Sequence, residues 1–124
     1  MKMIAFFRRR SDLTAEQFRQ HYETRHAPMA MRLFPCIRDY RRNYIRHDMA
    51  HRRASGGENT VDFDFDVITE ISFADRAGYE CMVKDMTDPR IRAQVIEDEM
   101  RFMDRDATVV ILVDEEVSEK REKF

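Results

Sequence analysis

Little in this sequence points to a membrane, a nucleic acid or a nucleotide. The chain has 124 residues, and 22 basic against 24 acidic side chains give it a net charge of −2. Such a balance offers no electrostatic footprint for nucleic acid or an anionic membrane. No apolar run approaches the ~20 residues that span a bilayer, and the sequence lacks a Gly-rich phosphate loop. We therefore expect no nucleic-acid, membrane or nucleotide partner.

Cysteine is also scarce. Cys36 and Cys81 lie far apart without a paired spacing, and the N-terminal residues do not resemble a signal peptide. These features predict free thiols and a cytoplasmic protein. His47 and His51 are four residues apart but lie off any predicted helix and lack the glutamate of a zinc-protease motif. We therefore expect no bound metal.

The pattern of apolar residues predicts one domain over residues 1–115 and a charged tail over residues 116–124. Strands are predicted over residues 2–9, 37–47, 63–73 and 107–114, and a polar loop over residues 48–60. Helices are predicted from Thr14 to about residue 33, from a cap at Ser72 or Asp75 to about Lys84, and from Pro89 to about Met103. This order favours an α+β class, a ferredoxin-like antiparallel four-stranded sheet with helices on one face.

Two of the predicted strands indicate a partner for the other face of the sheet. Thr108–Val113 is apolar throughout, which is typical of a strand covered on both faces. The 63–73 strand alternates strictly, so that its acidic residues share the face opposite its phenylalanines. A homodimer packed sheet on sheet resolves both observations. In it, Asp64, Asp66 and Glu70 would face arginines such as Arg8, Arg42 or Arg46.

The helix that begins at Thr14 carries polar groups on its inward side. At ~100° per residue, a common arc of about 80° holds its inward residues, namely Phe18, Tyr22, His26, Met29 and Leu33. Pro28 has no N–H for the carbonyl of Thr24, so the regular helix should end or kink at residues 25–27. A histidine there is either a core residue bonded to a carbonyl or, with a reference pKa near 6.5, an acid–base group.

Several segments together resemble the EthD domain family of the dimeric α+β barrel superfamily. They are the arginine-bearing first strand, residues 13–18, His26-Ala27-Pro28 after an aromatic residue, Tyr40 after the helix, and residues 98–104 before the last strand. The resemblance implies a pocket between helices and sheet in each subunit. It also implies metal-free chemistry, because relatives in the superfamily include cyclases, isomerases, dehydratases and monooxygenases that act on aromatic, lactone or polyketide-like compounds.

The residues and the resemblance together lead to a functional hypothesis. It is a cofactor-free lyase, cyclase or isomerase, including dehydratase-type chemistry, acting on an aromatic, phenolic or polyketide-like carbonyl compound. His26 would be the general acid/base, Tyr22 and Tyr40 would position the oxygen, and Glu99, on the inward arc of its helix, would either pair with an arginine or serve as a second acid. The predicted substrate-binding residues are Phe18, Met29, Leu33, Phe63, Phe65, Val67, Met82 and Phe102.

Two other functions remain open at this point. A non-catalytic protein that binds an apolar metabolite for a degradation or biosynthetic pathway would use His26 only as a hydrogen-bond partner. A cofactor-independent monooxygenase would consume oxygen during turnover.

Overall fold

The computed structural model describes residues 1–56 and 61–122. Part of the predicted 48–60 loop, residues 57–60, and the last two residues of the tail lie outside the described residues. The elements in chain order are β1 (Lys2–Phe7), α1 (Ala15–His21), the π-helical turn η1 (Tyr22–His26), α2 (Ala27–Leu33), β2 (Asp39–Tyr44), β3 (Val67–Ser72), α3 (Arg76–Asp85), α4 (Pro89–Phe102) and β4 (Val109–Val113).

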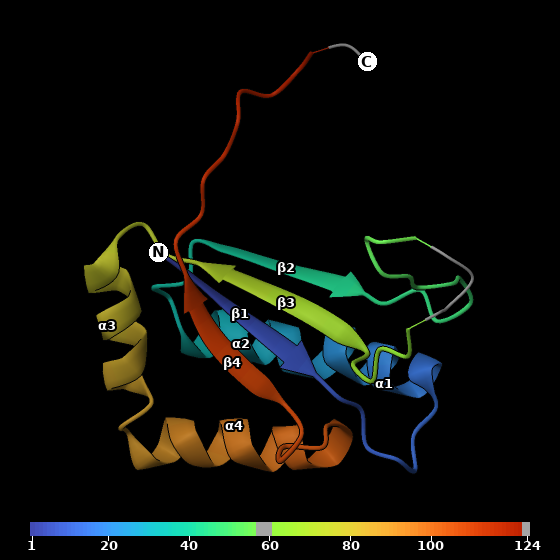
Figure 1. The fold of residues 1–124 in the computed structure, drawn as a ribbon. Helices are drawn as coiled ribbons and strands as arrows, with labels where there is room; N and C mark the ends of the chain where they lie inside the picture. Colours follow the sequence, from blue (N-terminus) through green and yellow to red (C-terminus); the bar gives the residue numbers. More distant parts are fainter. Residues whose placement is uncertain (57–60, 123–124) are drawn as a thin grey trace.

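The strands form one antiparallel sheet in the order β2-β3-β1-β4. The helices pack on one face of it, as Figure 1 shows. Ala5 and Phe7 of β1 and Val67 of β3 point to that face and are buried against helix residues such as Phe18 and Phe102. The predicted ferredoxin-like α+β fold is confirmed.

Side-chain caps set the starts of the helices. Thr14 and Gln17 form the predicted capping box at α1, with each side chain bonded to the backbone N–H of the other at 2.9 and 3.1 Å. Asp88 accepts from the N–H of Arg90 at 2.8 Å and begins α4. The cap of α3 is Asp75, which accepts from the N–H of Gly78 at 2.9 Å, rather than Ser72, which ends β3.

The strand predicted over residues 63–73 is shorter than expected. It begins at Val67, which pairs with Tyr44, the last residue of β2, and with Phe7, the last residue of β1. Phe63 and Phe65 lie before it, outside the sheet, because neither β1 nor β2 extends far enough to pair with them. Their rings pack on each other at 5.3 Å between centroids, and Phe65 packs on Phe6 at 5.5 Å.

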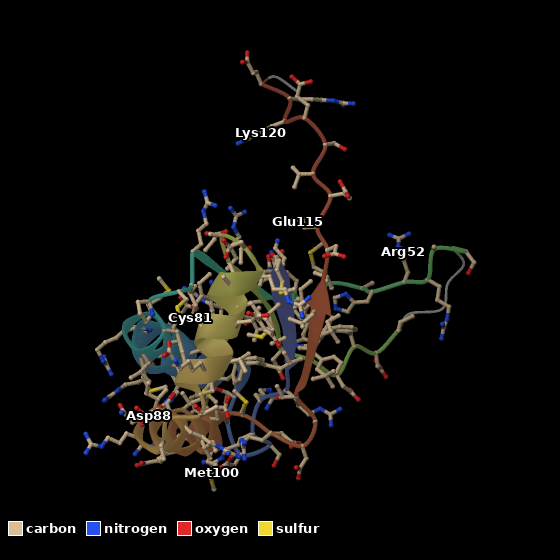
Figure 2. The ribbon with its side chains drawn as sticks, turned by 90° about the vertical axis from the view of Figure 1, so that its left-hand side faces the viewer. Arg52, Cys81, Asp88, Met100, Glu115 and Lys120 are labelled. Carbon is tan, nitrogen blue, oxygen red and sulfur yellow. A yellow bond between two sulfur atoms is a disulfide. The ribbon has the colours of Figure 1, made fainter. Side chains whose placement is uncertain are left out.

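The last strand, β4, lies at the edge of the sheet. The expectation that both of its faces are covered depends on the predicted homodimer and stays a prediction. Within the described residues, β4 pairs with β1 alone. Val109 to Leu112 are 42–55% exposed. After β4 the chain leaves the body of the fold, and residues 116–122 contain no helix or strand; Figure 2 shows Lys120 far from the sheet.

The prediction of free thiols is wrong. Cys36, in the turn after α2, and Cys81, on α3, form a disulfide with a Cα–Cα distance of 6.5 Å and a sequence separation of 45. Spacing along the chain gave no sign of this pair, because the fold of the intervening β2–β3 hairpin brings the two together. Among the described residues, no helix is long and apolar enough to cross a membrane.

The arginines expected to face the acids of the third strand from a second copy are paired within the chain. Arg8 binds Asp64 at 2.9 Å, Arg42 binds Glu23 at 2.7 Å, and Arg46 binds Asp48 at 2.7 Å. The remaining acids have partners too, because Asp66 binds Arg9 at 3.2 Å and Glu70 binds Lys2 at 2.9 Å. Arg42 in addition lies on the helix-covered face of β2, because it pairs with Glu23 of η1. These charges are therefore neutralised without an interface.

Candidate functional site

A cavity of about 320 Å³ lies between the helices and the sheet. Its walls come from all four strands and from η1, α2, α3 and α4, with residues before β2, after α3 and before β4. Most of the lining is aliphatic or aromatic, and polar groups interrupt it at residues that include His26, Tyr40, Glu99 and Thr108. A mostly apolar cavity with a few convergent polar groups is typical of a small-molecule site.

The π-helical turn places His26 in the cavity wall. Ala27 donates its N–H to the carbonyl of Tyr22, five residues back. Pro28 has no N–H for the carbonyl of Thr24, and a wider turn accommodates this without ending the helix. The break predicted at residues 25–27 is thus a π-helical turn over Tyr22–His26, a feature that is frequent at functional sites.

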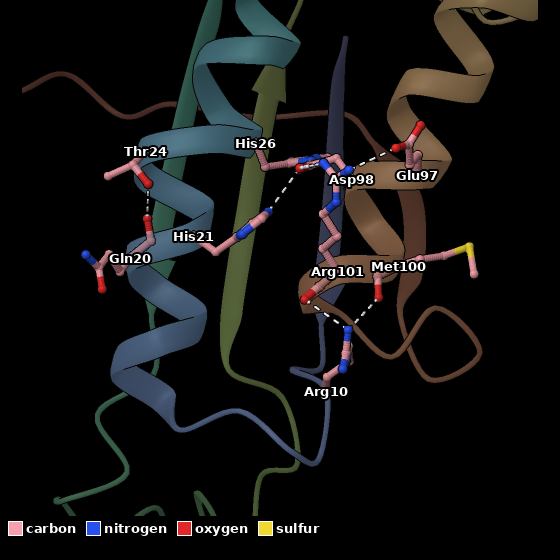
Figure 3. Close-up of polar contacts among 9 residues, drawn as sticks. All are labelled: Arg10, Gln20, His21, Thr24, His26, Glu97, Asp98, Met100 and Arg101. Carbon is pink, nitrogen blue, oxygen red and sulfur yellow. Dashed lines mark hydrogen bonds and ion pairs between the residues drawn. The ribbon is translucent and has the colours of Figure 1, made fainter.

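His26 is 5% exposed and bonded to a carboxylate. Its Nδ1 lies 2.9 Å from Oδ2 of Asp98 on α4 (Figure 3). Its ring packs on Phe102 at 4.9 Å and on Tyr22 at 5.5 Å between centroids. Burial lowers the pKa of His26 below its usual value of 6.5, although Asp98 opposes the shift. The ring is therefore neutral at pH 7.

Asp98 is itself buried and accepts from a second histidine. Its Oδ1 lies 3.0 Å from Nε2 of His21, the last residue of α1. A carboxylate oxygen accepts hydrogen bonds, so both contacts are hydrogen bonds in the tautomers whose facing imidazole nitrogens carry hydrogens. Sequence reasoning missed Asp98 and His21. The spacing of Val95, Asp98 and Phe102 along one face of α4, all of them buried, is the signal that points to Asp98.

A chain of three hydroxyl groups lies on the other side of Tyr22. The Tyr22 hydroxyl is 2.7 Å from Oγ1 of Thr69 and 2.7 Å from the hydroxyl of Tyr40. Tyr22 is fully buried and does not line the cavity, whereas Tyr40 does. Burial raises the pKa of Tyr40 to about 12 and that of Tyr22 well above its usual value. Both phenols therefore stay protonated at neutral pH.

Glu99 follows Asp98 and lines the cavity directly. Its Oε1 accepts from Nε of Arg105 at 3.1 Å. Burial raises the pKa of Glu99, and the pairing with Arg105 opposes the shift. The arginine partner expected from its inward position is thus present, and the carboxylate still reaches the cavity.

The predicted substrate-binding residues are spread over the fold. Met82, on α3, lines the cavity. Phe18, Met29, Val67 and Phe102 are buried in the core, and Leu33 is packed against it. Phe63 lines a different hollow near residues 47–66, and Phe65 lies beside it. The cavity instead takes its apolar walls from residues that include Met3, Phe34, Ile37, Ile71, Tyr79 and Val110.

That second hollow is larger, about 830 Å³, and several of its charged groups pair with one another. Asp66 binds Arg9 at 3.2 Å and lies 3.4 Å from Nε2 of His47. Arg8 binds Asp64 at 2.9 Å. Nε2 of His51, in the same wall, is buried without a hydrogen-bond partner among the described residues. We nevertheless place the candidate site in the smaller cavity, because a mostly apolar lining with a few convergent polar groups is typical of a small-molecule site.

In the described part of the chain, one group of side chains has the spacing of metal ligands. It consists of Cys36, Cys81 and Asp85. Both sulfur atoms are used in the disulfide. His47 and His51, considered above from the sequence, are not among these ligands.

Comparison with known proteins assigns most of the chain to one family. A family model described as the EthD domain matches residues 10–106. An EthD family protein from Bacillus halodurans is 23% identical, with a TM-score of 0.60 over 93% of this chain and 97% of that one. No curated protein matches.

Two further solved structures share the fold at lower identity. Protein At3g17210 from Arabidopsis thaliana is 14% identical, with a TM-score of 0.57 over 94% of this chain and 97% of that one. HapK from Hahella chejuensis is 14% identical, with a TM-score of 0.55 over 99% of both chains. At these identities the likeness shows the fold alone.

Proposed function

Because this chain belongs to the EthD domain family, we propose that its cavity is the active site of a cofactor-free acid–base enzyme. The reaction class is that of a lyase, cyclase or isomerase, including dehydration. The substrate is an apolar carbonyl compound, aromatic, phenolic or polyketide-like. The observation that carries the proposal is the imidazole of His26 in the cavity wall, whose Nδ1 contacts the buried carboxylate of Asp98.

His26 is the general base in this proposal. With its hydrogen on Nδ1 and donated to Asp98, the lone pair of Nε2 is free to take a proton from a carbon next to a carbonyl. Asp98 stabilises the imidazolium that then forms. The same imidazolium can return the proton to a different atom, which completes an isomerisation, a cyclisation or the loss of water.

Tyr40 supports the proposal at the oxygen end of the substrate. If Thr69 donates to Tyr22 and Tyr22 to Tyr40, the hydroxyl hydrogen of Tyr40 is left for a ligand. A protonated phenol there stabilises the negative charge that develops on an enolate oxygen. Glu99, whose pKa is raised, is a second acid within the same cavity. Tyr22 acts through Tyr40 and does not touch the substrate.

The proposal is tested by the proton transfer itself. Wild-type protein is incubated in D₂O with a panel of aryl ketones, 1,3-diketones and lactones, and deuterium uptake next to the carbonyl is followed by NMR. We expect uptake that falls by about 10²–10⁴ in His26→Gln. His47→Gln is the matched control, because the His47 side chain is 43% exposed and lies outside the cavity.

A different result would favour a binding protein. The largely apolar lining of the cavity suits a carrier of an apolar metabolite equally well. If compounds bind with the same affinity to wild type and His26→Gln but take up no deuterium in either, the catalytic proposal is wrong. Oxygen consumption during turnover would instead identify a cofactor-independent monooxygenase.

We also propose that two copies pack through the outer face of the sheet. Register across β3, β1 and β4 puts Ile68, Phe6 and Val109 in one row and Ile4 and Ile111 in the next. Val109 and Ile111 are 47% and 42% exposed in the single chain. Packing this face against a second copy would remove their apolar surface from water, which stabilises the dimer. Sedimentation should give a dimer that Ile111→Asp dissociates. Met100→Asp, at a residue 61% exposed on α4, should not dissociate it.

The cytoplasmic location stays a prediction. Disulfides are rare in the reducing cytosol, so the Cys36–Cys81 bond gives this prediction a specific test. Fractionation of cells with trapping of free thiols would locate the protein and report the state of both cysteines together.

A further inference from the structure

Two histidines share one buried carboxylate beside the cavity. Nδ1 of His26 lies 2.9 Å from Oδ2 of Asp98, and Nε2 of His21 lies 3.0 Å from Oδ1. Each oxygen of Asp98 therefore has its own imidazole donor. The proposed function uses only the contact to His26 and leaves His21 without a role.

The π-helical turn is what makes this sharing possible. In a regular α-helix, side chains five residues apart point about 140° away from each other at ~100° per residue. The bond from the N–H of Ala27 to the carbonyl of Tyr22 closes a wider turn. That turn brings His26 nearly above His21, and both rings face α4 (Figure 3). The backbone irregularity thus positions a pair of histidines rather than one.

The surroundings of His21 hold its ring in place. It stacks on Phe102 with 4.8 Å between centroids and an interplanar angle of 24°. Phe102 is fully buried and also contacts the ring of His26. The side chain of His21 is 22% exposed, so it stands between the buried carboxylate and solvent.

Arg101 is a further basic side chain near this carboxylate. Its Nη1 is 3.8 Å from Oδ1 of Asp98, beyond hydrogen-bond distance. Its Nη2 binds Glu97 at 2.8 Å, and its side chain is 59% exposed. His21 is therefore the nearer and better-held partner of Oδ1.

We propose that His21 is a positioning residue that holds Asp98 in the orientation required by His26. With Oδ1 bound to the Nε2–H of His21, Oδ2 is held toward His26 and accepts its Nδ1–H. This fixes the His26 tautomer in which Nε2 is bare and free to act as a base. The inference rests on the proposed function for its purpose, but the geometry it predicts can be tested without any substrate.

Nitrogen-15 NMR of the imidazole rings reads the His26 tautomer directly. Wild type should show the Nδ1–H form at neutral pH. In His21→Leu, which removes the donor, part of the His26 population should move to the Nε2–H form. His21→Gln should restore the wild-type spectrum, because its amide N–H can replace Nε2–H at Oδ1. Arg101→Gln is the matched control and should leave the tautomer unchanged.

The rate of deuterium uptake in the assay described under the proposed function should fall as the fraction of His26 in the Nδ1–H form falls. We expect a fall of about tenfold in His21→Leu, the lower end of the effect of losing a hydrogen-bond partner behind a metal-ligating histidine, and recovery in His21→Gln. An unchanged His26 tautomer in a folded His21→Leu variant would overturn the proposal, as would a shift caused by Arg101→Gln alone. A shifted tautomer in a protein without turnover would uphold the role of His21 and count against the proposed enzyme.

Discussion

The two helical walls of the cavity are built differently. Behind the wall made by η1 and α4 lie fully buried aromatic side chains, Tyr22 and Phe102, and the buried carboxyl group of Asp98. The wall made by α3 has no fully buried residue, and it is joined to the turn after α2 by the disulfide between Cys36 and Cys81. Met82 and Tyr79 of α3 are partly buried and pack against the core.

This difference suggests that the two walls have different roles: the η1–α4 wall carries the groups that react, and the α3 wall contacts the ligand or admits it. Groups that move protons need fixed geometry, and they lie on the wall where packing and hydrogen bonds hold each side chain in place. The α3 wall supplies apolar surface and few fixed contacts, which suits a surface that adapts to a ligand or opens for its entry. We therefore expect substitutions on the η1–α4 wall to affect rate and stability strongly, and those on α3 to affect ligand preference.

The largest effect on rate should come from Asp98. Asp98→Asn keeps the size of the side chain but turns one acceptor into an amide donor, so His26 loses its fixed tautomer and the charge that stabilises its protonated form. We expect deuterium uptake to fall by about 10²–10⁴. Thermal unfolding of the same variant should show that it folds. Activity within twofold of wild type would show that Asp98 has no part in the chemistry.

The largest effect on stability should come from Phe102. Its ring is fully buried against Phe7, Phe18, Tyr22 and both histidines. Phe102→Ala should lower the free energy of unfolding in urea by about 3–5 kcal/mol. Met82→Ala, on the partly exposed α3 wall, should cost only about 1 kcal/mol. Equal losses in the two variants would remove the contrast between the walls.

The disulfide should hold the α3 wall in place. Opening it releases a loop of 45 residues in the unfolded chain, and we expect a loss of about 2–4 kcal/mol in the free energy of unfolding. Cys36→Ser and Cys81→Ser should each reproduce the effect of a dithiol reductant on wild type, and the reductant should not destabilise either variant further. If the reductant leaves the stability unchanged and mass spectrometry finds two free thiols, the disulfide does not hold the α3 wall.

The smallest effect should be the pH dependence that arises from His26. Its folded-state pKa lies below the usual 6.5, because burial disfavours the charged ring. The unfolded chain therefore binds a proton at a higher pH than the folded protein, and folding stability falls as the pH drops below about 6.5. Urea titrations at several pH values should show this decline in wild type and a weaker one in His26→Gln. If stability instead rises as the pH falls through this range, the pKa of His26 is raised in the folded protein and not lowered.

Local signals in the sequence were sufficient for most of the fold. The Thr14–Gln17 capping box, the Asp88-Pro89 helix start and the apolar last strand each depend on neighbouring residues, and each element is present. The start of β3 was misplaced because alternation continues through Phe63 and Phe65, although neither neighbouring strand extends far enough to pair with them. Strand length depends on partners that the pattern within one strand does not reveal.

The candidate site was less predictable from the sequence, because it too depends on contacts between segments that are far apart in the chain. The apolar arc of the first helix pointed to His26 and Tyr22, and the family resemblance to Tyr40. The disulfide and the contact of Asp98 with two histidines join segments far apart in the chain. The π-helical turn that aligns those histidines was foreseen only as a break at Pro28, because proline shows where a helix is disturbed but not how the backbone responds.

A crystal structure with an aryl ketone bound would test most directly the claim that this cavity is the active site. We predict the carbonyl oxygen within hydrogen-bond distance of the Tyr40 hydroxyl, and the neighbouring carbon in front of Nε2 of His26. The Nδ1 contact of His26 to Asp98 should be kept. A ligand seated in the hollow beside residues 47–66, or one in the cavity with its carbonyl turned away from both Tyr40 and His26, would contradict the account.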